Sequence, residues 1–241
     1  MRLMKRILSA AAVLALSASL LVGCSSGTAS SVPVSASSAA ESTVSSVEET
    51  ASSAVDENEA AAAQLLNDLT GSYQELWPVI LADEYKQTWL DDCTALVGED
   101  NAEAAFEKLS SMVTGDVYGE DAVKAYANGG GAYFCGFTNS LATLTFDGET
   151  STISGTDKDG NVLFSHTYHY IGMEPVRGLY EFESDDADSG EFTYFFLAPD
   201  TSAETYHIEF RYGSDAEALS QYDAGEYAYW LASGISTDCD Q

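Results

Sequence analysis

The second half of the chain has a two-residue period, and this pattern constrains the fold more than any other feature. Six runs alternate apolar and polar side chains, and turns rich in Gly, Asp and Asn separate several of them. Side chains of a strand point alternately to its two faces, so the pattern predicts short antiparallel strands. The predicted strands cover Leu141–Phe146, Thr150–Gly155, Val162–Tyr170, Leu179–Glu183, Phe192–Ala198 and Thr205–Tyr212.

Apolar residues at helical spacing precede these strands. Three stripes predict three helices: Leu65, Leu66 and Leu69; Tyr85, Trp89, Cys93 and Leu96; and Phe106, Leu109 and Val113. Asp100 with Glu103 predicts a capping box at the start of the third helix, and Gly129–Gly131 mark the change from helix to strand. Helices followed by about six strands in about 180 residues predict one α+β domain, an antiparallel β-barrel or curled sheet with N-terminal helices.

The N-terminus predicts export. A basic start, Met1–Arg6, precedes an apolar run, Ile7–Val22, which is shorter than a typical membrane span. The ending Leu-Val-Gly-Cys is similar to the lipobox of bacterial lipoproteins, so we expect residues 1–23 to be a signal peptide and Cys24 to be lipidated. The alternative is an ordinary cleaved signal with an incidental cysteine. Acyl chains on Cys24 would anchor the chain to the extracytoplasmic face of the cell membrane without spanning it.

Residues 24–58 are rich in Ser, Ala and Glu and contain almost no large side chain. Such a segment buries too little apolar surface to offset its ordering entropy, which predicts a disordered tether. The folded domain is then expected over residues 59–241. The whole chain has 39 acidic and nine basic residues and a formal net charge of −30. This charge repels phosphate backbones and argues against a nucleic-acid partner.

Two smaller features limit the chemistry of the domain. Cys93, Cys135 and Cys239 form an odd set whose spacing fits no zinc knuckle, so we expect at most one disulfide, with its partners left open. The segment 157–161 has acidic residues like those of a calcium loop but lacks the bidentate Glu of an EF-hand. A hairpin turn is the better interpretation.

The last predicted strand carries the candidate site. Thr205, His207, Glu209 and Arg211 fall on one face, and Tyr206, Ile208, Phe210 and Tyr212 fall on the other. An imidazole and a carboxylate side by side can both bind a transition metal. We therefore predict His207 and Glu209 as metal ligands that point into a shared cavity. Further donors could be His166 or His169, of which at most one points inward because they are three residues apart.

An ordered series of motifs resembles the bacterial ZinT (YodA) family. The matching positions are Gly71, Tyr73, Trp77-Pro78, Ile80-Leu81, Arg177–Glu183, Ala198-Pro199, His207, Glu209-Phe210, Tyr212-Gly213 and Asp215. The resemblance covers most of residues 65–235 and implies an exported zinc-binding domain with a lipocalin-like, or calycin-type, barrel and added helices. It also implies a three-histidine zinc site, whose positions fall here on Phe195, His207 and Glu209. A two-residue shift would pair Thr205 with His207 instead.

The resemblance implies a membrane-anchored metal-binding lipoprotein, for zinc or cadmium, with an altered site and a metal transporter as a candidate partner. The alternative is a calycin-type carrier of a small apolar ligand, or an interaction module, without a metal. Neither a nucleophile elbow, a phosphate-binding glycine loop, an HExxH motif nor a carboxylate pair spaced for acid–base work is present in the sequence. We therefore expect no enzymatic activity.

Overall fold

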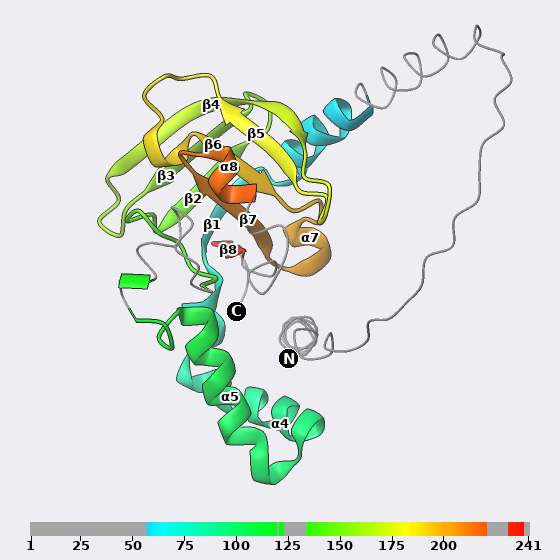
Figure 1. Cartoon of the computed structure of the whole chain (residues 1–241), viewed down its shortest axis with the longest axis vertical. Coiled ribbons are helices and arrows are strands. Elements are labelled where there is room, and N and C mark those ends of the chain that lie inside the picture. The colour runs from blue at the N-terminus through cyan, green and yellow to red at the C-terminus, as the bar shows by residue number, and fades with distance from the viewer. Residues whose placement is uncertain (1–56, 120, 123–133, 221–230, 239–241) are drawn as a thin grey trace, which may run out of the picture.

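A computed structural model describes residues 57–119, 121–122, 134–220 and 231–238 of the chain. Its centre is a closed antiparallel barrel in which strands β1 to β8 pair in chain order and β1 pairs with β8 (Figure 1). Closure leaves no sheet edge with unpaired backbone groups. The predicted α+β fold with an antiparallel calycin-like barrel and N-terminal helices is confirmed.

The elements follow the chain in a simple order, after a first helix over residues 57–68. They are β1 (Gly71–Glu75), α3 (Leu76–Ile80), the 3-10 helix η1 (Asp83–Tyr85), α4 (Lys86–Val97), α5 (Glu99–Thr114), β2 (Thr143–Asp147), β3 (Thr152–Thr156), β4 (Val162–Met173), β5 (Tyr180–Ser184), the 3-10 helix η2 (Gly190–Phe192), β6 (Tyr194–Leu197), α7 (Ser202–Thr205), β7 (Ile208–Gly213), α8 (Ala216–Ser220) and β8 (Ala232–Ser236).

Aromatic side chains fill the barrel interior. Phe195 and Phe210 are fully buried, and their rings lie with that of Tyr212 at centroid distances of 5.5–6.2 Å. Phe164 stacks on Phe192 with centroids 4.0 Å apart. Eight-stranded barrels are narrow enough for side chains to fill them. The interior of this barrel is therefore a packed core built from these rings.

The first helix packs against the barrel through its predicted stripe. Leu65, Leu66 and Leu69 are buried in the same cluster as the barrel rings. Gly148, in the turn after β2, lies against this helix so closely that a Cβ there would come within 2.4–2.6 Å of the helix backbone. Glycine is required at this contact because any side chain would push the helix away from the barrel.

Helices α4 and α5 form a hairpin that extends away from the barrel (Figure 1). Trp89 of α4 is buried at its base and donates its indole N–H to the carbonyl of Ile80 at 2.7 Å. Val113 is buried, and Phe106 and Leu109 pack beside it, as their spacing predicted. Leu96 was expected in the α4 stripe but is 53% exposed, so that prediction is wrong.

Two other local predictions differ from the structure, and a third is confirmed. Helix α5 begins at Glu99 after Gly98, without a side-chain cap, so Asp100 does not form a capping box. Thr205 belongs to α7, and Tyr206 is a left-handed residue with φ 69°, so neither continues strand β7. The hairpin turn at Asp157 is confirmed, because its carboxylate accepts the N–H groups of Asp159 and Asn161 at 2.9 Å.

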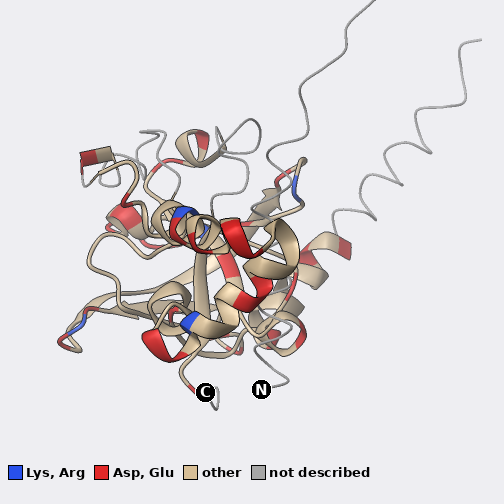
Figure 2. Ribbon diagram, turned by 90° about the horizontal axis from the view of Figure 1, so that it is seen from below, with Lys and Arg blue, Asp and Glu red and all other residues tan. Residues whose placement is uncertain are grey.

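Several expectations concern residues outside the described part of the chain. These are Cys24, the signal peptide, the tether up to residue 56, Gly129–Gly131 and Cys239; residues 57 and 58, predicted as the end of the tether, belong to the first helix. Within the described part, Cys93 and Cys135 are buried and are not joined to each other by a disulfide. The described helices include none with the length and apolar character that crossing a bilayer would require. Figure 2 shows Asp and Glu spread over many elements, with few Lys and Arg.

Candidate metal centre

His207 immediately precedes β7, and Glu209, the second residue of that strand, lies on the same side of it. Their side chains are 11% and 16% exposed, and His207 Nε2 lies 3.5 Å from Glu209 Oε1. The other face of β7, which carries Ile208, Phe210 and Tyr212, lines the barrel interior. The pair therefore lies on the outer side of the barrel wall and not in the barrel interior.

The segment between α7 and β7 fixes the His207 ring. Its Nδ1 lies 2.9 Å from the carbonyl oxygen of Thr205. A carbonyl only accepts hydrogen bonds, so Nδ1 carries the hydrogen and Nε2 is the nitrogen that can bind a metal. The Thr205 hydroxyl donates to backbone carbonyls, those of His207 at 2.7 Å and Thr201 at 3.0 Å. Thr205 thus holds the backbone around His207, and its hydroxyl is turned to these carbonyls.

The left-handed conformation of Tyr206 makes this arrangement possible. Tyr206 ends α7, and its positive φ of 69° changes the direction of the chain before β7 begins at Ile208. His207 consequently shares the outer face with Glu209, while Ile208 enters the barrel core. Residues with a Cβ rarely adopt this conformation, and such strain is common at functional sites.

Two more charged side chains lie near the pair. Arg177 Nη2 is 3.8 Å from Glu209 Oε2, the oxygen that does not face His207. Asp200 is close enough for charge interactions with both Glu209 and His207. Burial and the Glu209 charge raise the pKa of the Asp200 carboxyl, although its own backbone N–H and His207 act in the opposite direction. A cation beside Asp200 and Glu209 would relieve this repulsion.

The imidazole responds to the same neighbours. Burial alone would lower the pKa of His207, but Glu209, the Thr205 carbonyl and Asp200 together raise it above its ordinary value. The surroundings of Nε2 thus favour positive charge, whether it comes as a proton or as a metal ion.

The geometry fits a pair of metal ligands but not a complete cage. Two donors at about 2.0–2.1 Å from a tetrahedral zinc ion lie roughly 3.3 Å apart, close to the 3.5 Å between His207 and Glu209. In the described part of the chain, no three His, Cys, Asp or Glu side chains are grouped as a metal site. Phe195, the third position implied by the family resemblance, lies fully buried in the barrel core.

The other two histidines lie on β4 and pair with other carboxylates. His166 Nδ1 is 2.9 Å from Asp186, and His169 Nδ1 is 2.7 Å from Asp185. His166 shares the inward face with Phe164 and stacks on its ring, while His169 is 51% exposed on the outward face. The prediction that at most one of them points inward is confirmed.

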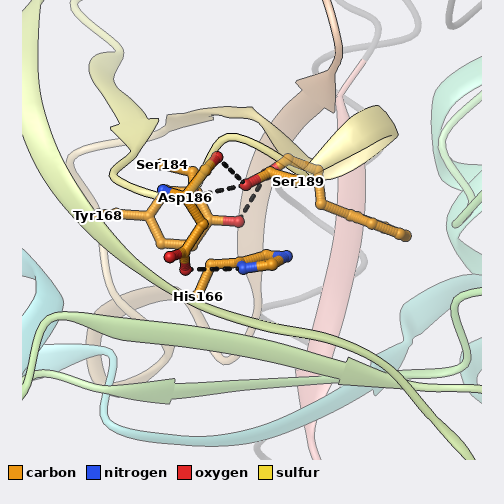
Figure 3. Close-up of polar contacts among 6 residues, drawn as sticks. His166, Tyr168, Ser184, Asp186 and Ser189 are labelled. Carbon is orange, nitrogen blue, oxygen red and sulfur yellow. Dashed lines mark hydrogen bonds and ion pairs between the residues drawn. The ribbon is translucent and has the colours of Figure 1, made fainter.

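The hydroxyl groups of Tyr168, Ser184 and Ser189 lie near the His166–Asp186 pair (Figure 3). Ser189 donates to Ser184 at 2.7 Å and also bonds the backbone carbonyl of Asp186. The Tyr168 hydroxyl donates to the carbonyl of Phe192 at 2.5 Å. These hydrogen bonds join residues of β4 to the segment after β5, so the cluster has a structural role in holding the two together.

Arg177 and Asp200 were not predicted as site residues. Arg177 lies in the turn between β4 and β5, and Asp200 follows β6, so both come from segments separate from β7. Arg177 belongs to the motif series that resembles the ZinT family, and this was the only feature of the sequence that pointed to a role for it. Asp200 had no signal beyond its place after Pro199, because acidic residues are abundant throughout this chain.

Comparison with family models and with curated proteins finds no match. Two solved structures are similar. One is the Zn(II)-bound ZinT-like domain of AdcA from Streptococcus pneumoniae, at 17% identity and a TM-score of 0.45, covering 73% of this chain and 84% of that one. The other is Zn(II)-bound AdcA from the same organism, at 15% identity and a TM-score of 0.43, covering 73% of this chain.

The chain spans 33% of the length of the AdcA structure. The ZinT-like domain has the same family name as the resemblance given by the order of residues in this sequence.

Proposed function

We propose that this chain is an extracytoplasmic, lipid-anchored protein that binds a divalent transition metal ion as cargo, zinc or cadmium, at His207 and Glu209. The observation that carries the proposal is the placement of His207 Nε2 at 3.5 Å from Glu209 Oε1, with Nδ1 held by a backbone carbonyl. Metal-binding histidines characteristically have their second nitrogen fixed in this way. Asp200, whose charge interacts with both side chains, is the candidate for a third donor.

These donors favour a transition metal over calcium or magnesium. An imidazole is a poor ligand for those hard cations, which prefer all-oxygen sites, whereas zinc accepts mixed nitrogen and oxygen donors. Two carboxylates from Glu209 and Asp200 would balance the charge of a divalent ion. Cys24 and the segment that follows it would tether the domain to the membrane, within reach of a metal transporter.

The barrel interior argues against the alternative of an apolar carrier. A carrier needs a concave site lined by apolar side chains, but Phe195, Phe210 and Tyr212 are at most 1% exposed and pack against one another. A ligand could enter only by displacing these rings. The half-buried charged cluster outside the barrel is the better candidate for a binding site.

Calorimetric titration of the purified chain with zinc, in excess calcium, tests the proposal. Calcium occupies the diffuse acidic surface, so zinc at micromolar concentration reports a specific site. We expect one saturable site, weakened by at least about tenfold in His207→Ala and in Glu209→Gln. His169→Ala is the matched control, because this exposed histidine also pairs with a carboxylate. Absence of saturable binding, or equal loss in the control, would contradict the proposal.

A further inference from the structure

The turn between β4 and β5 is held by a fully buried carboxylate. Glu174 is 0% exposed, and its two oxygens accept the backbone N–H groups of Val176 and Arg177. The Glu174 backbone bonds Leu179 at 2.8 Å and Gly178 at 3.0 Å. A carboxylate with this many backbone partners fixes the base of the turn firmly.

This turn brings a guanidinium to the candidate site. The Arg177 backbone is fixed by Glu174, and its side chain reaches the outer face of β7, where Nη2 is 3.8 Å from Glu209 Oε2. The Arg177 side chain is 22% exposed, so its charge is only partly screened by solvent. Glu209 thus lies between two positive or potentially positive groups, Arg177 on one oxygen and His207 on the other.

Arginine keeps its charge at every pH that a protein tolerates. A divalent ion bound by Glu209 and His207 would be placed near this permanent positive charge. In this partly buried setting, the repulsion between a divalent cation and a guanidinium is strong enough to weaken metal binding by at least about tenfold. Metal and guanidinium therefore compete for the same carboxylate.

We propose that Arg177 is a built-in competitor that neutralises Glu209 in the metal-free protein and is displaced toward solvent when a metal ion binds. The inference rests on the proposed function and adds regulation of the same site. The exposed side of the turn leaves room for the movement, because Val176 is 63% exposed. Displacement would convert metal binding into a change at the surface, where the turn carries Pro175 and Val176.

Competition titration with a zinc chelator measures the first consequence. We expect Arg177→Gln to bind zinc at least about tenfold more tightly than the wild type, since one nearby positive charge is removed. Lys158→Gln is the matched control for net charge, because Lys158 is exposed in the β3–β4 turn. Its zinc affinity should stay within about twofold of the wild type, because the charge of an exposed lysine is screened by solvent and salt.

Limited digestion with trypsin measures the second consequence, without any variant. Trypsin cleaves after Lys and Arg, so cleavage after Arg177 reports whether this side chain is held at Glu209. We expect zinc to accelerate cleavage after Arg177 in the wild type and to leave cleavage after Lys158 unchanged. The Lys158 site is therefore an internal reference for the activity of the protease.

The outcomes separate this inference from the proposed function. If the wild type binds zinc and Arg177→Gln binds it equally or less tightly, the inference is overturned and the proposed function stands. Slower cleavage after Arg177 in the presence of zinc would also overturn it. If neither protein binds zinc saturably, both fail. If only Arg177→Gln binds, the competition is confirmed.

Discussion

β7 carries different chemistry on its two faces. The inner face contributes Ile208, Phe210 and Tyr212 to the barrel core, and all three are at most 3% exposed. The outer face presents Glu209 to His207 and Arg177. The inner side chains act through packing with neighbours from the whole barrel, whereas the outer ones act through charge with a few residues. Changes on the two faces should therefore affect different properties of the protein.

The largest expected effect comes from the inner face. Phe210→Ala removes a fully buried ring that contacts Phe137, Phe195 and Tyr212. We expect the free energy of unfolding to fall by about 3–5 kcal/mol, from lost burial and a residual cavity. Glu209→Gln on the outer face should cost about 1 kcal/mol or less, because its partners are partly solvated. Chemical denaturation measures both values, and a larger loss in Glu209→Gln would contradict the comparison.

A smaller effect is expected where the β4–β5 turn supports the outer face. Glu174→Gln weakens two charge-assisted hydrogen bonds to backbone N–H groups in a fully buried position. We expect a loss of about 1–3 kcal/mol in the free energy of unfolding. Glu149→Gln, exposed in the β2–β3 turn, is the matched control and should be neutral. Equal stability of the two variants would show that the turn does not depend on the Glu174 charge.

The smallest expected change in the free energy of unfolding concerns Glu75, the last residue of β1. Burial raises the pKa of Glu75 above its ordinary 4.5, although the Phe137 N–H acts against this. A raised folded-state pKa means that the group favours the fold when protonated, and this contribution is lost as pH rises through that pKa. The wild type therefore loses stability as pH rises through this pKa, whereas Glu75→Gln, which does not titrate, loses none. The free energy of unfolding of the variant, relative to that of the wild type, should increase from acid to neutral pH. A pH-independent difference in unfolding free energy would contradict the prediction.

Most of the barrel could be predicted from the sequence, except the two strands that close it. The six predicted runs correspond to β2 through β7. β1 and β8, with the sequences GSYQE and ASGIS, are short and rich in small or polar residues, and lack a clear apolar alternation. Their strand conformation is set by pairing with each other and with their neighbours, a tertiary effect that a local pattern does not contain.

The candidate site was predictable only in part. Alternation placed His207 and Glu209 on one face, and the structure confirms that they are neighbours. Alternation did not show which of the two faces would line the barrel, because it places residues 208, 210 and 212 on one face and residues 207, 209 and 211 on the other without saying which face is inside. Arg177 and Asp200 reach the site through tertiary contacts from other segments. Such contacts depend on the register of β5, β6 and β7 rather than on local sequence.

Barrel closure also determines how the domain would resist a pull on the residues that precede it. The chain enters the barrel at β1, which is hydrogen-bonded to β2 on one side and to β8 on the other. An edge strand would peel away under tension, one hydrogen bond after another, but β1 has ladders on both sides. A pull that reaches β1 through the first helix would therefore be shared by strands from both ends of the sequence, and the outer face of β7 would keep its geometry under that load.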